Sequence, residues 1–169
     1  MDFLDAVKSR RSIRAFMDTP VEKDKIRKVL EAANSAPSAH NSQEYEIFLM
    51  EDRRKIEELK SAVRQEFILK APAVLVFCAH LGQEKDSKRP LSEMFPVQDA
   101  TIAASYAQLA AAALGLGSVW VGSFDPDKLR EVLGAPKEFV PVVLMPIGYP
   151  AEHPEAKPRR SLDDIVHRM

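Results

Sequence analysis

The most constraining feature of this chain is the segment from Ala100 to Phe124, which contains no charged side chain. A segment of this length is long enough to cross a bilayer. Its side chains are mostly small, however, and Gly115 and Gly117 would end a helix before it crossed. We therefore expect a buried helix that leads into a glycine turn and a short strand.

The same helix also indicates that the chain associates with a second copy of itself. A helix that is apolar all round needs cover on every side, and a chain of 169 residues offers little of its own. Packing against the same helix of a second copy would supply that cover. The sequence therefore predicts a homodimer with this long helix at its interface.

Composition limits the class of protein. The chain is 46% hydrophobic, with 24 basic against 25 acidic residues, which predicts a single folded domain over residues 1–169 and excludes disorder. The near-neutral charge argues against a polybasic nucleic-acid binder. The one cysteine, Cys78, excludes a disulfide framework and a multi-thiolate metal site. Acidic Asp2 and Asp5 stand where a secretory signal would be basic, so we expect a cytoplasmic protein that does not enter a membrane.

The remaining patterns predict an α+β domain with helices packed on a central sheet. The expected helices cover residues 2–9, a span from the capping box at Thr19 to Pro37, 56–63, 97–116 and 125–134; the expected strands cover residues 45–50, 73–78, 119–121 and 139–147. The continuous apolar strand 73–78 should be covered on both faces. Pro141 and Pro146 suggest bends or an edge position for the last strand. We expect an exposed, mobile loop at 82–90 and a short helix starting at Ser161.

Several kinds of active site are disfavoured. The four histidines, His40, His80, His153 and His167, lie far apart and never at the i, i+4 spacing of a helical zinc site. Cys78 ends an apolar strand, which is typical of a small buried thiol rather than a nucleophile. The Gly115–Gly117 motif follows a helix and precedes a strand, the reverse of a dinucleotide-binding turn.

Two basic clusters remain, one near each end of the chain. Arg10, Arg11 and Arg14 surround Ser12, and Lys157, Arg159 and Arg160 lie in the tail. Either cluster alone could be solvated surface charge. Together, guanidinium groups and a hydroxyl could bind a small anion such as a phosphate.

An ordered set of motifs resembles the nitroreductase family of FMN-dependent flavoproteins. The set runs through the chain as Arg10-Arg-Ser-Ile-Arg14-x-Phe16, Pro20-Val21, Ala36-Pro-Ser-Ala-His-Asn41-Ser-Gln43, Gln98-Asp99, Leu114-Gly-Leu-Gly117, Trp120-Val-Gly122-Ser123-Phe124, Ile147-Gly-Tyr-Pro150 and Lys157-Pro-Arg159. The resemblance implies a mainly antiparallel sheet flanked by helices. It also implies a homodimer with FMN at the subunit interface.

The resemblance implies an FMN site. Arg10 and Ser12 would face the phosphate with Lys157 and Arg159, Arg14 would lie near the pyrimidine edge of the ring, and Arg11 belongs to the same motif. Pro37, Ser38, Ala39, Asn41 and Gln43 match a loop that reaches the flavin from the other subunit. Val121, Gly122 and Ser123 match a strand whose amides face flavin N5.

The implied chemistry is ping-pong electron transfer from NADH or NADPH, through FMN, to a small acceptor such as a nitroaromatic or a quinone. No side chain need act as a nucleophile, so we assign no catalytic residue and no metal. Trp120 and Phe124 could stack on the flavin or belong to the core, with the core favoured.

The chain departs from longer family members in two places. Only residues 80–96 stand where those members insert lid helices, so Met94, Phe95 and Pro96 could form a reduced lid. A polar amide that the family places on the flavin would be replaced near Arg64.

Two alternatives stay open. A family relative could use FMN for dehalogenation, azoline oxidation or flavin cleavage. A non-enzymatic module could instead use the basic ends to bind a phosphorylated partner or a nucleic acid, although a basic face with interleaved aromatic residues is missing.

Overall fold

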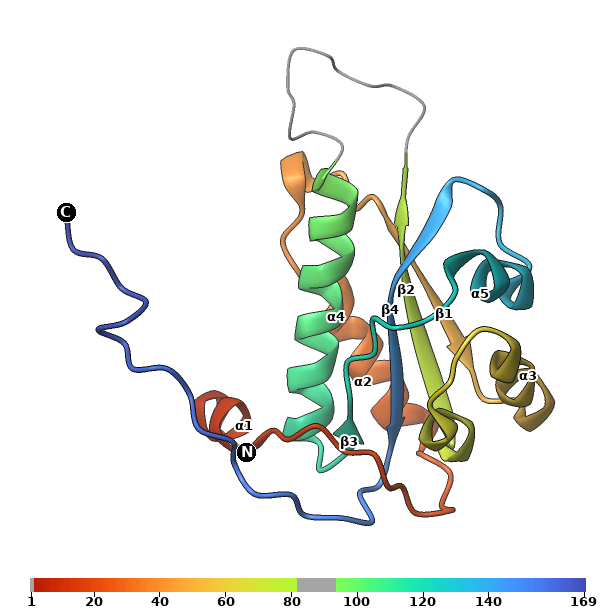
Figure 1. Ribbon diagram of the computed structural model, residues 1–169, viewed down its shortest axis with the longest axis horizontal. Coiled ribbons are helices and arrows are strands. Elements are labelled where there is room, and N and C mark those ends of the chain that lie inside the picture. The colour runs from red at the N-terminus through yellow and green to blue at the C-terminus, as the bar shows by residue number, and fades with distance from the viewer. Residues whose placement is uncertain (1, 82–93) are drawn as a thin grey trace.

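The fold is built on a four-stranded antiparallel sheet in the order β1-β2-β4-β3 (Figure 1). A computed structural model of the protein describes residues 2–81 and 94–169. The strands are β1 (Tyr45–Met50), β2 (Ala73–His80), β3 (Gly117–Ser118) and β4 (Phe139–Gly148). The expected antiparallel sheet with flanking helices is confirmed. The loop expected at 82–90 lies outside the described residues.

Helices cover both faces of this sheet. In Figure 1, α2 (Lys23–Asn34) and α4 (Phe95–Ala113) lie on one side, and α3 (Arg53–Glu58) and α5 (Pro126–Leu133) lie on the other. Each pair of helices packs over its own hydrophobic cluster. The short α1 (Phe3–Ser9) lies against α4 instead of the sheet.

Strand β2 shows why helices must cover both faces of the sheet. Its first seven residues are all buried. Because side chains alternate along a strand, Leu75 and Phe77 join the core under α2 and α4, while Val74 and Val76 join the core under α3 and α5. The prediction of a strand covered on both faces is confirmed.

Strand β4 is central, so the expectation of an edge position was wrong, although the expected irregularity is present. The register of β2 against β4 shifts between Phe77 and Cys78, where Cys78 pairs with Pro141. On the other side, the register places Val119 opposite Pro146, which has no N–H to donate. The β3 ladder accordingly ends at Ser118 instead of spanning the expected 119–121, with an isolated bridge at Val121.

Helix ends differ from expectation in three places. Helix α2 begins after Glu22 and not at Thr19, because Glu22 is still extended and the residue before it, Val21, is buried in the core. The expected helix 56–63 is α3 followed by a 3₁₀ turn at Leu59–Ser61. The segment from Ser161 forms a turn and no helix.

The uncharged segment forms most of α4 and the whole of β3. Along α4, Ala100, Ala103, Ala104 and Ala107 are fully buried against the sheet and α2, while Tyr106 is exposed on the far side. Within the described ranges, no helix has both the length and the apolar character that a bilayer crossing requires.

Candidate functional site

The first basic cluster lies on an extended segment, residues 10–17, that is fixed between β3 and the end of β4. The Ile13 N–H donates to the Ser118 carbonyl at 3.0 Å, and the Met17 N–H donates to the Tyr149 carbonyl at 2.9 Å. The Ala151 N–H returns a bond to the Ala15 carbonyl at 2.9 Å. These bonds bring the start of the chain beside residues 149–151, so the two basic clusters become neighbours.

Close packing sets the position of this segment. Ile13 is buried with 6% of its surface exposed, and it lies against Gly117 of β3. A Cβ at Gly117 would lie 2.8 Å from the Ile13 Cγ1, a distance that only glycine avoids. The glycine after α4 therefore determines where Ser12 and Arg14, the neighbours of Ile13, are placed.

The two clusters line one cavity of about 460 Å³. It is bounded by the end of α1, the 10–17 segment and the tail, and its lining holds six cations against one carboxylate: Lys8, Arg10, Arg11, Arg14, Lys157 and Arg159 against Glu155. Ser12 lines it too. We call this the basic cavity. The structure thus brings together all the residues expected at one end of the FMN site; Arg160 instead donates to the Asp164 carbonyl at 2.6 Å.

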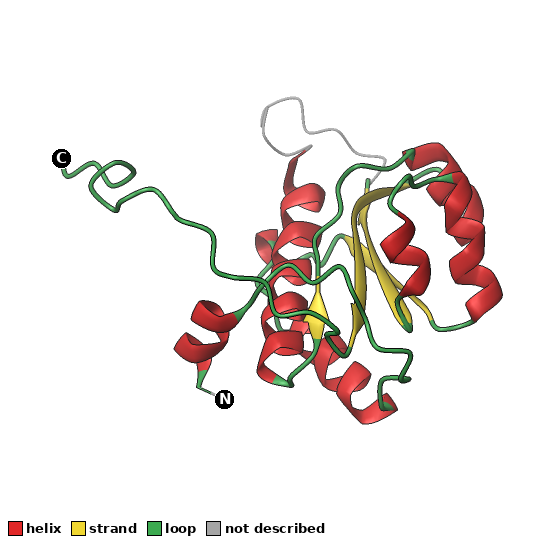
Figure 2. Ribbon diagram, turned by 60° about the horizontal axis from the view of Figure 1, so that its bottom comes forward, coloured by secondary structure: helices red, strands yellow, loops and turns green. Residues whose placement is uncertain are grey.

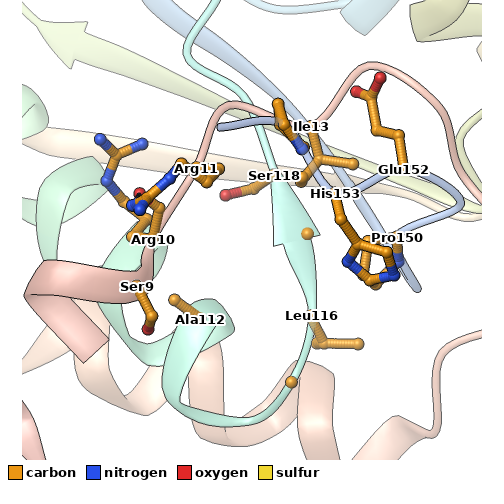
Figure 3. A pocket seen from close by; sticks show the side chains of 13 residues that line it. Ser9, Arg10, Arg11, Ile13, Ala112, Leu116, Ser118, Pro150, Glu152 and His153 are labelled. Atoms are coloured by element: carbon orange, nitrogen blue, oxygen red, sulfur yellow. Dashed lines mark hydrogen bonds between the residues drawn. The ribbon is translucent and has the colours of Figure 1, made fainter. Parts of the chain in front are cut away.

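A second hollow of about 350 Å³ adjoins the basic cavity, because both are lined by Arg10, Arg11 and Pro154. Figure 3 shows it from close by, with Arg10 and Arg11 on one side of β3 and Glu152 and His153 on the other. The arginine pair therefore stands between two concave surfaces. A ligand larger than a phosphate has room to extend along β3.

Electrostatics in the basic cavity favours an anion. Burial lowers the pKa of Arg10, and the nearby positive charges of Arg159 and Arg11 lower it further. Both effects disfavour the charged guanidinium, and a bound anion would offset the repulsion. Arg11 is held by its own bonds, from Nη1 to the Lys8 carbonyl at 2.7 Å and to the Arg10 carbonyl at 2.9 Å.

Glu152 holds the backbone beside Arg14. Its carboxylate accepts hydrogen bonds from the Arg14 N–H and from the Ala15 N–H, the latter at 3.2 Å. The Arg14 side chain itself is exposed. The site therefore uses a carboxylate to fix the backbone and leaves the guanidinium available to a ligand.

The segment 121–123 follows β3 directly. Val121 is buried and exchanges two 3.0 Å hydrogen bonds with Leu144, while Gly122 and Ser123 are exposed. The side-chain amide of Gln65 donates to the Ser123 carbonyl at 3.2 Å. Gln65 directly follows Arg64, the position near which we expect the family's amide to be replaced.

The expected flavin loop has an unusual backbone. His40, Asn41 and Gln43 all have positive φ, at 53°, 58° and 53°. This left-handed region costs a non-glycine residue on the order of 1–2 kcal/mol. A strained conformation of this kind persists when the surrounding structure fixes it, and such strain is concentrated at functional sites.

This loop and the basic cavity lie at opposite ends of α4. The Ala39 N–H donates to Asp99 near the start of α4, whereas Ala112 near its end lines the hollow beside Arg10 (Figure 1). Thirteen residues of helix at 1.5 Å each separate these points by about 20 Å. One chain therefore does not bring Pro37, Ser38, Ala39, Asn41 and Gln43 to the basic cavity.

Two aromatic residues near β3 differ in burial. Phe124 packs against the core under α3 and α5, as favoured from the sequence, whereas Trp120 is 37% exposed, so its assignment to the core was wrong. Of the proposed reduced lid, Phe95 and Pro96 form the first turn of α4 and Met94 is exposed. Burial raises the pKa of Cys78 to about 12, which leaves little thiolate at neutral pH.

Sequence reasoning gave no role to four residues at these sites. Ser118 and Glu152 fix the 10–17 segment, Gln65 bonds the strand at Ser123, and Asp99 bonds the 38–43 loop. Only Asp99 carried a signal, as the single acid at the start of an otherwise uncharged helix. Among residues 2–81 and 94–169, no group of three or more His, Cys, Asp or Glu side chains could hold a metal ion.

Comparisons with known proteins agree with this geometry. The profile of the nitroreductase family matches residues 7–70 and 58–149. A putative NADH dehydrogenase/NAD(P)H nitroreductase of Methanothermobacter thermautotrophicus is 34% identical over 91% of this chain and 80% of its own length. An FMN reductase [NAD(P)H] of Bacillus subtilis is 32% identical over 99% of this chain and 73% of its own.

Solved structures show the same fold. The structure of NfrA2 of B. megaterium superposes with a TM-score of 0.90 at 29% identity, covering 99% of this chain and 74% of that one. The family profile and the relatives together span the 10–17 segment, α4, β3 and β4. The chain belongs to the nitroreductase family.

Proposed function

We propose that this protein is an FMN-dependent oxidoreductase that takes electrons from NADH or NADPH and passes them to small acceptors such as nitroaromatics and quinones. The observation that carries the proposal is the basic cavity, in which Arg10, Arg14, Lys157 and Arg159 lie together with Ser12. Family membership and the names of the relatives, FMN reductase and NAD(P)H nitroreductase, support the choice of cofactor and electron donor.

The cavity suits the phosphate of FMN. Arg10, Lys157 and Arg159 supply guanidinium and ammonium donors, and Ser12 supplies a hydroxyl. Hydrogen bonds to a charged group contribute about 1.5–3 kcal/mol each. The adjoining hollow, which residues 115–118 line, gives the rest of the molecule room beside the phosphate.

The ring would lie where the chain leaves space and a positive charge. Nothing lies within 4 Å of the position that a Cβ at Gly122 would occupy. The exposed guanidinium of Arg14 would stabilise the negative charge that reduction places on the pyrimidine edge. When bound, FMN supplies a carrier that accepts hydride from the nicotinamide and returns electrons to the acceptor in a ping-pong sequence.

A second copy of the chain completes the proposed site. The 20 Å that separate the 38–43 loop from the basic cavity exclude a joint contact within one chain. Large apolar side chains lie exposed on α1, where Phe3 and Leu4 are 65% and 59% exposed, and on the projecting tail, where Leu162 is 72% exposed. In the homodimer that we propose, the loop of one protomer faces the flavin of the other.

The direct test is a visible absorption spectrum of the purified protein. We expect a flavin band, identified as FMN by the mass of the released chromophore, that bleaches under anaerobic conditions with NADH or NADPH. A second addition of a nitroaromatic or a quinone should restore the oxidised band. A protein that remains colourless after incubation with FMN would overturn the proposal.

A matched pair of arginine variants tests the assignment of the cavity. Arg159→Ala removes a cation from the lining, so the dissociation constant of FMN should rise by about tenfold or more. Arg160→Ala removes the adjacent cation, whose guanidinium bonds the Asp164 carbonyl, and should leave FMN binding near that of the parent protein. Equal FMN affinity in the two variants would contradict the assignment.

A further inference from the structure

Asp99 is a buried charge in an apolar helix. Among the charged residues that the structure describes, it alone is buried, with 2% of its surface exposed. Its neighbours on the same face of α4 are alanines of the hydrophobic core. Burying a carboxylate is costly unless hydrogen bonds stabilise it, so this position needs a reason.

The contacts of Asp99 supply the reason. Its Oδ1 accepts a hydrogen bond from the Ala39 N–H at 3.0 Å, and its Oδ2 accepts one from the Ser42 hydroxyl at 3.4 Å. Both donors belong to the 38–43 loop, which precedes α4 by more than fifty residues. The carboxylate therefore bonds the loop at two points that flank its left-handed residues His40 and Asn41.

Further hydrogen bonds hold the loop within itself and to α2. Within the loop, the Gln43 N–H donates to Ser38 Oγ at 3.1 Å. After it, the Tyr45 N–H donates to the Gln43 carbonyl at 2.8 Å, and the Tyr45 hydroxyl donates to the Ala33 carbonyl of α2 at 3.4 Å. Asp99 thus joins the strained part of the loop to the long helix.

We propose that Asp99 is a positioning residue that fixes the left-handed conformation of the 38–43 loop and so presents the loop to the flavin of the partner subunit. Its effect on flavin rests on the function proposed above; its effect on the loop does not. The residue acts through the backbone of Ala39 and the side chain of Ser42.

The chemistry of the two bonds selects the informative substitutions. Asp99→Ala leaves a buried N–H and a hydroxyl without their acceptor. Asp99→Asn keeps an oxygen for the Ala39 N–H, and its amide can donate to the Ser42 oxygen once the hydroxyl turns. Asp99→Asn should therefore keep the two hydrogen bonds that Asp99→Ala removes.

Asp52→Ala is the matched control. Asp52 is also a carboxylate that accepts a backbone N–H, from Arg54 at 2.8 Å, where it caps α3 on the other face of the sheet. This variant loses stability through a similar contact that does not involve the loop. It separates a general loss of stability from a change in loop position.

The experiment measures amide hydrogen exchange of residues 38–43 in the protein without FMN, then FMN affinity and the visible circular dichroism of the bound flavin. For Asp99→Ala we expect loop exchange faster by about tenfold, FMN binding weaker by about tenfold and an altered flavin dichroism. Asp99→Asn should stay close to the parent in all three. Asp52→Ala should change exchange in α3 and leave the loop and the flavin signals unchanged.

The outcomes separate this inference from the proposed function. Loop exchange in Asp99→Ala equal to that in Asp52→Ala overturns the role of Asp99. Faster loop exchange with unchanged FMN affinity and dichroism also overturns it, because the loop would then not act on the flavin. A parent protein that binds no FMN refutes the proposed function, and loop exchange still decides whether Asp99 fixes the loop. Should Asp99→Ala not fold, Ser42→Ala removes one bond alone, and an unchanged loop exchange would refute the inference.

Discussion

At Gly117 the backbone of β3 lies against Ile13, with 2.8 Å between the position of a Cβ and the Ile13 Cγ1. Both residues are buried, so neither can move aside cheaply. We expect Gly117→Ala to lower the free energy of unfolding by about 1–3 kcal/mol. It should also weaken FMN binding, because the clash displaces Ser12 and Arg14. Chemical denaturation and an FMN titration measure the two effects.

A second substitution tests the cause. Ile13→Ala removes two of the three atoms that the new Cβ would meet, Cγ1 and Cγ2, and leaves the Ile13 Cβ at 2.9 Å, so Gly117→Ala should cost less in that background than in the parent protein. Equal costs in the two backgrounds would show that the contact between residues 13 and 117 does not limit the packing there.

Gly122 gives the opposite combination of effects. Nothing lies within 4 Å of its Cβ position, so Gly122→Ala should change the free energy of unfolding by no more than about 0.5 kcal/mol. FMN affinity should nevertheless fall, because the segment 121–123 is proposed to face the flavin ring. Thermal unfolding without FMN, followed by an FMN titration, checks both parts. Unchanged affinity would place the ring elsewhere.

Single residues were predictable where the chemistry belongs to the residue type. Two clusters of guanidinium and ammonium groups with a serine indicate an anion site if the fold brings them together, and the basic cavity contains both. Glu152 and Gln65 were not predictable in this way, since each acts on a backbone group far along the chain. Their roles depend on tertiary proximity, which single-residue chemistry does not encode.

At the scale of elements, the apolar patterns of the sequence correctly predicted the strand and the helix that pack in the core. The apolar run of β2 and the uncharged span of α4 are strong signals because nearly every residue supports them. The start of α2 and the central place of β4 depended instead on single residues, the apparent cap Thr19 and two prolines. In both places the tertiary need to bury Val21 and to pair β4 with β2 outweighed the local preference.

Helix α5 begins where its local sequence predicts, directly after Asp125. Asp125 accepts the N–H groups of Asp127 and Lys128, both at 3.1 Å, and Leu129 of the same helix is fully buried. Asp125→Ala should therefore lower the free energy of unfolding by about 1 kcal/mol. Asp127→Ala is the control, because its exposed carboxylate bonds the Arg130 side chain and does not cap the helix. Equal losses measured by denaturation would mean that the cap does not support the helix.

At the scale of the whole molecule, the projecting tail carries apolar side chains that a single chain leaves exposed. Residues 155–169 are exposed throughout and extend away from the body of the molecule (Figure 2). Leu162, Ile165 and Val166 are 72%, 50% and 51% exposed within one turn of chain. Fully burying a side chain of this kind contributes about 1.5–3 kcal/mol. Such a segment favours binding to another protein surface, and in the proposed homodimer that surface belongs to the partner subunit.

The double variant Leu162→Ser, Ile165→Ser tests this association. Removing both side chains should shift the protein from dimer toward monomer, and analytical ultracentrifugation over a range of concentrations measures the change. FMN occupancy should fall with the dimer, because the loop of each protomer would leave the flavin of the other. Leu49→Ser is the control, since Leu49 is also exposed, at 37%, but lies on β1 at the far edge of the sheet. A tail variant that stays as dimeric as this control would show that the contacts between subunits lie elsewhere, and α1 with the outer face of α4 would then have to supply them.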